Sequence, residues 1–503
     1  ADFMVNINKR IDDFTVVVNA GTSLSDNSSD LLGYGGPIRD TGVPNVFNVF
    51  DLDNAKKRAT QEGWEEMTQS IFASAEIGWK SMLYLTLTGR NDWASQLKGS
   101  NPTSFFYPSV GLSAVISEMV TLPKAIDYLK VRGSFSSVGT PYPRFLVQPT
   151  YSYDPTKQDW NAKTHYPIGK LKPERTDSWE IGVDGTFFKD FKVSGSFYYA
   201  NTYNQTFDPK ITVSSGYSTL YVQTGYVRNL GVEGLLSYGH TWRDFGWNCN
   251  FTFSWNKNKI VELVKDYVHP ETGEIVNKDR LELKGLGYTK FILKEGGTLG
   301  DLYTNADFIR DDKGYIQIDK NGDVAKTDNL PDIKLGSVFP KANLAWNNSF
   351  SYKGIYAGFQ LSARLGGIVY SATQAALDQY GVSEASAAAR DRGGVLVNGR
   401  SWVNAQQYYE IVATSSGLPQ YYTYSATNLR LQEAHIGYTI PRKWLGNICD
   451  INVSVVGRNL WMIYCKAPFD PEAIATTSNF YQGIDYFMMP STRNFGFNVK
   501  INF

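Results

Sequence analysis

A two-residue periodicity in hydrophobicity runs through most of this chain. In the stretch FGWNCNFTFSWN, residues 245–256, the aromatic side chains share one parity and the asparagine, threonine and serine side chains share the other. Successive side chains of a β-strand point to opposite faces, so this pattern predicts a strand with one apolar and one polar face. The pattern recurs in about fifteen segments and predicts an all-β fold.

The links between these segments alternate between short and long. The short links include KRIDD, WRDFG and YKG. The long links run roughly from Ser23 to Glu65, Asp92 to Thr103, Gly139 to Glu174, Gln205 to Val222, Asn258 to Pro340, Ile368 to Thr427 and Lys466 to Pro490. Short turns on one rim and long loops on the other are typical of a transmembrane antiparallel β-barrel, with periplasmic turns, extracellular loops, an apolar outside and a polar lumen. A large soluble sandwich or propeller would also alternate, but it does not require links of alternating length.

The strand count and the first residues suggest that this is part of a larger barrel. About fifteen strands is an odd number, and complete bacterial barrels have even numbers. The opening ADFMVNINKR reads as the inside of a strand and lacks the pattern of a signal peptide. We therefore expect residues 1–503 to be the C-terminal portion of a barrel whose first strands lie on an earlier part of the polypeptide.

In one predicted strand the hydrophobic alternation changes parity. In NLRLQEAHIGYTIP, Leu429 and Leu431 lie on the apolar parity, whereas Ala434, Ile436 and Tyr438 continue that face on the other parity. One inserted residue near Glu433 would restore the alternation, so we expect a β-bulge there.

Charge and apolar run length exclude other classes of protein. The 49 Lys and Arg residues balance 49 Asp and Glu residues, so the chain has no basic field for nucleic acid. The chain has no run of about 18 apolar residues, which excludes a spanning helix but not spanning strands. Cys249, Cys449 and Cys465 are too far apart to indicate a disulfide framework or a zinc site.

The sequence offers no catalytic or metal motif. Four carboxylates could be paired for hydrolysis, but charges that face the lumen and pair with Arg or Lys of neighbouring strands are the favoured interpretation. These carboxylates are Asp177, Glu180, Asp184 and Glu233. The stretch DKNGD, Asp319 to Asp323, suggests calcium, yet Val324 and Leu330 occupy the positions where an EF-hand needs Gly and Glu. We expect a hairpin turn there, and no cofactor, metal or enzymatic activity.

Aromatic side chains gather in the long loops. Flat rings with polar edges can stack on sugars or contact peptide backbone, so we expect this group to bind a substrate or a partner protein. The group comprises Trp160, Tyr166, Tyr217, Tyr221, Trp402, Tyr408, Tyr409, Tyr421 and Tyr422. The alternative for any single ring is that it packs the loops or belongs to the interfacial girdle.

Several blocks resemble the SusC-like branch of the TonB-dependent transporters of Bacteroidetes outer membranes. They are LTLTGRNDWAS with FFYPSVGLSAVISE, LKPERTDSWEIGVDGTFF, NLGVEGLLSYG, LRLQEAHIGYTIP, VVGRNLW and PFDPE, and they extend from about Leu83 to Phe503. The resemblance implies a 22-stranded barrel, of which about seven strands, the plug domain and the TonB-binding Ton box are absent from this chain. It also implies that the terminal Phe503 is the signal read by the barrel assembly machinery.

The resemblance further implies a function. A SusC-like protein imports oligosaccharides or oligopeptides across the outer membrane, draws energy through the TonB complex and works with a SusD-like surface lipoprotein as a lid. The alternative is a surface barrel that binds or adheres without active transport. An upstream plug and Ton box would favour transport over adhesion.

Overall fold

The computed structural model describes residues 1–503 except 41–45, 47, 101, 147–150, 155–158, 163–164, 167–170, 208–218, 221, 269–272, 274, 288, 478–480 and 503. Phe503, the expected assembly signal, is therefore outside the described residues. No helix in the described part of the chain is long and apolar enough to cross a membrane.

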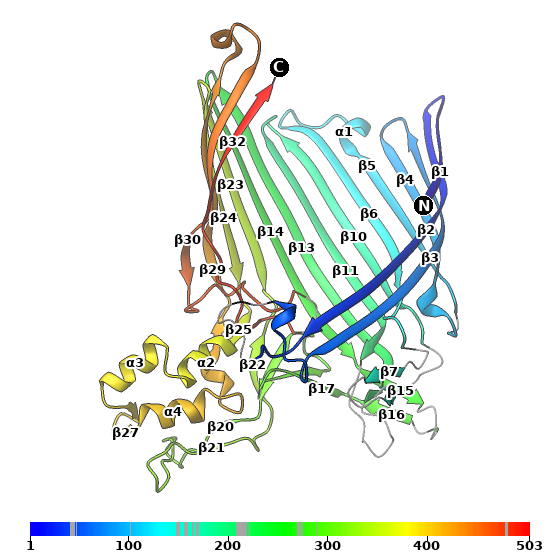
Figure 1. The fold of residues 1–503 in the computed structure, drawn as a ribbon. Helices are drawn as coiled ribbons and strands as arrows, with labels where there is room; N and C mark the ends of the chain where they lie inside the picture. Colours follow the sequence, from blue (N-terminus) through cyan, green and yellow to red (C-terminus); the bar gives the residue numbers. More distant parts are fainter. Residues whose placement is uncertain are drawn as a thin grey trace.

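Fifteen antiparallel strands form one curved sheet, which we call the wall (Figure 1). In sheet order, which is also chain order, the strands are β1 (Asp2–Ile11), β2 (Phe14–Gly35), β3 (Arg58–Trp79), β4 (Leu83–Ala94), β5 (Phe105–Val115), β6 (Ile126–Thr140), β10 (Glu174–Phe187), β11 (Phe191–Phe207), β13 (Val222–Trp242), β14 (Phe245–Glu262), β23 (Ala342–Tyr352), β24 (Ile355–Leu365), β29 (Asn428–Ile440), β30 (Asp450–Cys465) and β32 (Asn494–Asn502). Each strand pairs with its neighbours in the chain, as expected for an up-and-down barrel wall. Over the described residues, β1 and β32 are the two ends of this order.

Short turns join the strands at one rim, at the top of Figure 1. Trp242 pairs with Phe245, and Tyr352 pairs with Ile355, so two residues close each of these hairpins. Lys353 and Gly354 in one of these turns both have positive φ, at 46° and 89°. This conformation matches the right-handed twist of the flanking strands, which is why two residues suffice.

The long links gather at the other rim, but the first of them is shorter than predicted. Pairing between β2 and β3 continues to Gly35 opposite Arg58, so the link covers residues 36–57 rather than Ser23 to Glu65. The predicted boundary was wrong because Ser25 to Ser29 are polar on both parities. Backbone pairing needs no apolar face, so a hairpin can continue where the hydrophobic pattern stops.

The wall exposes large apolar side chains on one face. In β10, Trp179, Ile181 and Val183 are 59%, 64% and 41% exposed. The register carries this face across the sheet, since Ile181 lies opposite Phe197 and Phe197 lies opposite Val232. A soluble sandwich would cover such a face with a second layer. The exposed apolar face therefore suits lipid, and it confirms the predicted all-β barrel architecture.

Three of the long links pack together into one compact unit beside the wall, which we call the loop body (residues 263–341, 366–427 and 466–490). It contains the sheets β17 (Arg280–Lys284), β18 (Lys290–Lys294), β19 (Asp301–Thr304), β22 (Ile333–Ser337) and β28 (Thr423–Ser425), β25 (Ile368–Ser371), β31 (Ile484–Asp485). Helices α2 (Ala372–Gln379), α3 (Glu384–Asp391) and α4 (Ala405–Val412) lie at its outer side in Figure 1. Leu293 and Leu302 are fully buried there and Phe291 is 1% exposed. The loop body thus has a hydrophobic core of its own.

The remaining elements are short. They are α1 (Ile116–Met119), β7 (Tyr151–Asp154), β8 (Asp159–Ala162), β9 (His165–Tyr166), β12 (Thr219–Leu220), β15 (Val264–Val268), β16 (Ile275–Lys278), β20 (Asp307–Phe308), β21 (Lys326–Thr327), β26 (Val395–Val397), β27 (Ser401–Val403) and four 3-10 turns, η1 (Val49–Asp51), η2 (Ser95–Leu97), η4 (Pro419–Tyr422) and η5 (Arg442–Leu445). All but α1 and η5 lie in the long links.

Two local predictions are confirmed. The register between β24 and β29 shifts where Gln360 pairs with Glu433 and Leu361 pairs with Leu431, which leaves Gln432 as the extra residue of a bulge. The DKNGD stretch is a turn in which the Gly322 amide donates to the Asp319 carbonyl at 3.1 Å, with φ of +86° at Gly322. The Asp319 carboxylate accepts the amides of Asn321 and Asp323, so it caps this turn.

Candidate functional site

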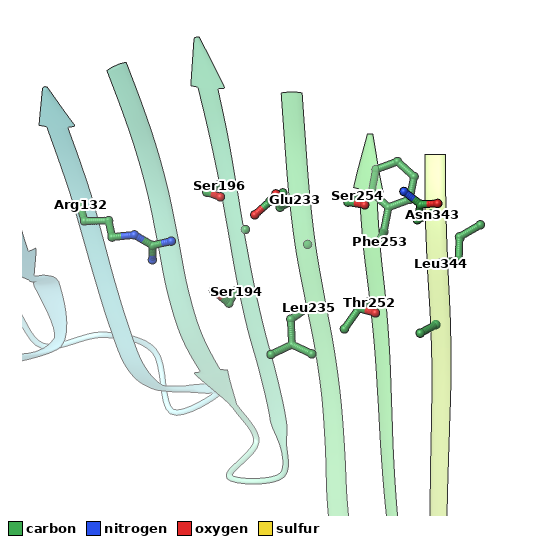
Figure 2. A pocket seen from close by; sticks show the side chains of 13 residues that line it. Arg132, Ser194, Ser196, Glu233, Leu235, Thr252, Phe253, Ser254, Asn343 and Leu344 are labelled. Carbon is green, nitrogen blue, oxygen red and sulfur yellow. The ribbon is translucent and has the colours of Figure 1, made fainter. Parts of the chain in front are cut away.

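A row of small polar side chains crosses the polar face of the wall. The register places Ser196 opposite Glu233, Glu233 opposite Ser254, and Ser254 opposite Asn343. One row along, Ser194 and Thr252 lie opposite Leu235. These residues line a shallow cavity of about 420 Å³, drawn in Figure 2. The cavity has the hydroxyl, amide and carboxylate groups that a hydrated solute could contact.

Arg132 of β6 borders this cavity and holds two carboxylates of β10. Its Nη1 lies 2.5 Å from Asp184 Oδ2, and its Nη2 lies 3.6 Å from Glu180 Oε1. Ser194 donates its hydroxyl to the other oxygen of Asp184 at 2.6 Å. The cluster confirms the prediction that Glu180 and Asp184 pair with a cation of a neighbouring strand.

Gly182 makes room for that guanidinium. It lies opposite Arg132 in the register, and a Cβ at Gly182 would lie 2.5 Å from Arg132 Cζ. Any side chain at Gly182 would therefore displace the Arg132 head group from the wall. The glycine therefore leaves room for the Arg132 guanidinium at this position.

The other two predicted carboxylates, Asp177 and Glu233, have different surroundings. Asp177 pairs with Arg175 of its own strand at 2.8 Å, not with a neighbouring strand as expected, because residues two apart in a strand share one face. Glu233 lies in the cavity between Ser196 and Ser254 (Figure 2). The described residues of this face thus combine ion pairs with small polar side chains.

Three of the predicted aromatic residues meet in the loop body. Tyr408 and Tyr421 pack against Phe308, with ring centroids 6.3 and 5.3 Å apart. Tyr408 also contacts Tyr409 edge-on at 5.4 Å. Burial raises the pKa of Tyr408 to about 12, so its phenol stays neutral. These rings form part of the loop body's packing.

Tyr422 is the most buried of the predicted rings whose side chains the structure describes. It is 4% exposed, and its hydroxyl donates to Asp378 Oδ2 at 2.9 Å. Burial first, and then the negative charge of Asp378, raise the pKa of Tyr422. Tyr422 therefore satisfies a buried carboxylate, and a ligand could reach it only by opening the loop body.

The exposed rings are Trp160, Trp402 and Tyr421. Their exposed fractions are 63%, 56% and 41%. Trp160 lies next to Tyr153, with ring centroids 5.3 Å apart, and Trp402 is on the hairpin β26–β27 opposite Leu396. Tyr166 is described only by its backbone in β9, and Tyr217 and Tyr221 are outside the described residues. Among the described rings, Tyr408, Tyr409 and Tyr421 thus lie together in the loop body, whereas Trp160 and Trp402 lie on separate hairpins.

The sequence reasoning missed a charged cluster at the rim. Arg430 of β29, only 6% exposed, forms two hydrogen bonds with Asp470, at 3.1 and 2.7 Å. Asp470 and Glu472 belong to the PFDPE block, which was singled out only for its family resemblance. The alternation places Arg430 on the polar face of its strand. It does not show whether the side chain faces a water-filled lumen or forms a buried ion pair, so the burial of Arg430 could not be predicted.

The fold and these faces together define an outer-membrane type of transmembrane β-barrel wall. Residues 5–460 match the family described as TonB dependent receptor-like, beta-barrel. The chain belongs to that family, which is one of outer-membrane receptors and transporters rather than enzymes.

Similar proteins agree with this assignment. TonB-dependent receptor P3 of Formosa agariphila is 24% identical over 463 residues, which cover 86% of this chain and 45% of that protein. TonB-dependent receptor SusC of Bacteroides thetaiotaomicron is 24% identical over 246 residues, or 44% of this chain and 24% of that protein. The chain thus spans less than half the length of either relative.

A solved structure shares the fold of the whole chain. The structure of the RagAB peptide importer in its open-open state superposes with a TM-score of 0.72 at 16% identity, covering 100% of this chain and 54% of that one. At this identity the likeness is one of fold. The match to the receptor named SusC agrees with the SusC-like resemblance drawn from the sequence blocks.

Proposed function

We propose that this chain takes part in active import of large nutrients, oligosaccharides or oligopeptides, across the bacterial outer membrane. The observation that carries the proposal is the polar face of the wall, where small hydroxyl and amide side chains flank Glu233 over a cavity of about 420 Å³. Passage of a hydrated solute requires polar side chains along its path, and this face supplies them. Membership of a transporter family supports the same function.

We also propose that residues 1–503 are the C-terminal part of a larger barrel. In the described residues β1 and β32 each have one partner strand, and an unpaired strand edge in lipid costs several kcal/mol for each backbone group. Further strands, a plug and a Ton box would complete the protein and couple it to the TonB complex. Phe503 would then be the assembly signal.

The partner in this proposal is a SusD-like lipoprotein lid over the loops. Among the described rings of the predicted group, Trp160, Trp402 and Tyr421 are exposed enough to contact a lid or a substrate. The likeness to the RagAB peptide importer favours peptides as a first substrate class to test. Oligosaccharides remain the other class, because aromatic faces stack on sugars as well.

The test is growth of the source bacterium on defined nutrients. Deletion of the gene should abolish growth on one class, a peptide mixture or a glycan, and loss of TonB function should give the same defect. A deletion strain that grows normally on every nutrient while losing attachment to a surface would instead support the adhesion alternative.

Recognition is tested with the full-length protein and its lid. Trp402→Ala or Tyr421→Ala should weaken ligand or lid binding by about 1–3 kcal/mol for each true anchor. Asn250→Ala, on the polar face of the wall, serves as the control and should alter passage more than capture. Unchanged affinity in both aromatic variants would move recognition to the plug or to the lid.

A further inference from the structure

The hairpin β2–β3 extends past the neighbouring strand β4 at the rim of the long loops. Its two strands stay paired up to Gly35 opposite Arg58, whereas β4 pairs with β3 only as far as Thr68. Figure 1 shows this hairpin, in blue, reaching the rim where the long links gather. The far end of the hairpin therefore lies where a solute first meets the loops.

A cavity of about 890 Å³ lies at this end of the hairpin. Three consecutive cations, Lys56, Lys57 and Arg58, line the cavity, and its described lining residues include no carboxylate. Lys56 lies 3.6 Å from Asp53, whereas Lys57 and Arg58 form no ion pair with any described residue. The cavity thus offers two positive charges to a ligand.

Two glycines leave one side of this cavity bare. Gly33 lies opposite Thr60 and Gly35 lies opposite Arg58, with no register shift between the two strands. A Cβ at Gly35 would have no atom within 4 Å, and a Cβ at Gly33 would meet Thr60 Cβ at 3.7 Å. Neither glycine has a positive φ. A bulge, a crowded neighbour and a special backbone conformation therefore do not explain them. Glycine inside a strand otherwise marks a place where a ligand approaches the backbone closely.

The bare side of the cavity belongs to the polar face of the wall. Ser113 of β5 lies opposite both Arg132 of β6 and Tyr84 of β4. Tyr84 in turn lies opposite Gly78 of β3. Alternate residues of a strand share a face, so the even-numbered residues of β3, as far as Arg58, continue the polar face. Lipid headgroups would meet the apolar face instead, so the ligand that suits this cavity is a dissolved anion.

A β-bridge joins the two arms of the link just beyond the cavity. Ile38 pairs with Leu52 in this bridge. Residues 41–45 and 47, which are outside the described residues, come between these two in the chain. The cations and glycines of the cavity lie on the strand side of the bridge, in the part of the chain that the structure describes.

We propose that this hollow is a capture site for a solute that carries closely spaced anionic groups, carboxylate or sulfate. The Arg58 guanidinium offers such a group two parallel N–H donors, and Lys57 adds a second positive charge beside it. Gly33 and Gly35 let the solute come close to the backbone of β2. The site rests on the proposed import function, for which it names the charge of the solute.

The exposure of the cations decides how the site binds. Lys57 and Arg58 are both exposed to water. Each contact with an anion is therefore weak and is screened by salt. A solute with several anionic groups binds more tightly than a solute with one, because the second contact is made within the same complex.

The experiment titrates the purified full-length protein in a calorimeter with two anionic probes, a sulfated dextran oligosaccharide and an oligoglutamate peptide. Neutral dextran of the same length is the uncharged comparison, and at least one anion should bind more tightly than it does. Lys57→Gln combined with Arg58→Gln should weaken anion binding about five- to tenfold at low salt, and the difference should shrink at high salt. Lys313→Gln combined with Lys320→Gln removes two exposed cations from another long link, so it is the matched control and should leave the affinity unchanged.

A second variant fills the hollow and keeps every charge. Gly35→Val adds a side chain where the structure has open space, so the hairpin should fold as before while anion binding weakens several-fold. Gly496→Val in β32 is its control, because a Cβ there would meet Val456 Cγ1 at 3.6 Å, and it should leave binding unchanged. If the double lysine and arginine variant does not reach the membrane, Gly35→Val decides.

The site is overturned if neutral dextran binds as tightly as both anions, or if Lys57→Gln combined with Arg58→Gln leaves both anion affinities unchanged. An equal loss in the Lys313 and Lys320 control, or an unchanged affinity in Gly35→Val, would likewise place the anions outside the hollow. A loss for sulfated dextran identifies the solute as a glycan, and a loss for oligoglutamate identifies it as a peptide. Affinity is measured without transport, so failure of this site leaves the import function, which growth tests, standing.

Discussion

The wall and the loop body use the same kinds of residue in opposite ways. Phe497 in the wall is 82% exposed, whereas Phe291 in the loop body is 1% exposed. The wall alternates apolar and polar side chains around a sheet, and its apolar side faces outward. The loop body buries its apolar side chains between sheets and helices, as a soluble domain does. A hydrophobic residue in this chain therefore indicates burial only when its region is known.

The comparison is tested most strongly by one substitution made in both regions. Phe291→Ala should destabilise the loop body by about 3–5 kcal/mol, because it leaves a cavity in a packed core. Phe497→Ala removes the same ring from an exposed face and should leave the loop body unchanged. Hydrogen exchange of loop-body amides in the full-length protein measures both. Equal protection in the two variants would show that the loop body has no core of its own.

A charge placed on either face of the wall tests whether the apolar side of the wall faces outward. Ile181→Lys puts an ammonium on the apolar face and should cost about 2–4 kcal/mol if that position lies near the middle of the bilayer. Ser196→Lys puts the same group on the polar face opposite Glu233, and it should cost far less. Denaturant unfolding of the full-length protein in bilayers gives both values. A larger loss for Ser196→Lys would reverse the two faces.

The wall could be predicted from the sequence almost entirely. Period-two alternation is a local signal, and the pairing of each strand with the next follows from short turns such as Lys353 and Gly354. The extent of β2 and β3 could not be predicted, because polar residues on both parities carry no signal there. The loop body was invisible for a related reason. Strands such as β18 and β19 are short and buried on both faces, and segments far apart in the chain, such as β25 and β31, meet only in the folded protein.

The candidate site could be predicted in composition but not in placement. Tyr421 and Tyr422 are adjacent in the sequence and equally suited to binding, yet one is 41% exposed and the other 4%. They lie in the 3-10 turn Pro419–Tyr422, where successive side chains point about 120° apart. Which one faces the core depends on Asp378, which is 44 residues away in the chain. No local pattern contains that information.

The two adjacent tyrosines give a third prediction, of intermediate size. Tyr422→Phe removes the donor to a buried carboxylate and should destabilise the loop body by about 1.5–3 kcal/mol. Tyr421→Phe removes a hydroxyl that accepts a 3.3 Å hydrogen bond from Arg310 at the surface, and it should change stability little. Hydrogen exchange of loop-body amides, measured at increasing temperature, compares the stability of the two variants. A larger effect at Tyr421 would contradict the assignment of Tyr422 to the core.

The smallest effect concerns pH and the charged edge of the loop body. Asp332 accepts two hydrogen bonds from Arg280, at 3.0 and 3.1 Å, and lies 3.2 Å from Lys294 Nζ. Burial alone would raise the pKa of Asp332, but the hydrogen bonds from Arg280 and Lys294 outweigh it, so the pKa is lowered.

Because the folded pKa of Asp332 is below the unfolded value of about 3.9, the network stabilises the loop body above that pH. The contribution is lost as the pH falls through the lowered folded pKa. We expect a loss of about 0.5–1 kcal/mol, since Arg280 is 39% exposed and such pairs contribute little. Asp332→Asn should be less stable at pH 7 by this amount and should lack the acid-dependent loss, whereas the exposed Asp312→Asn should match the wild type. An acid-dependent loss that persists unchanged in Asp332→Asn would place its origin in another carboxylate.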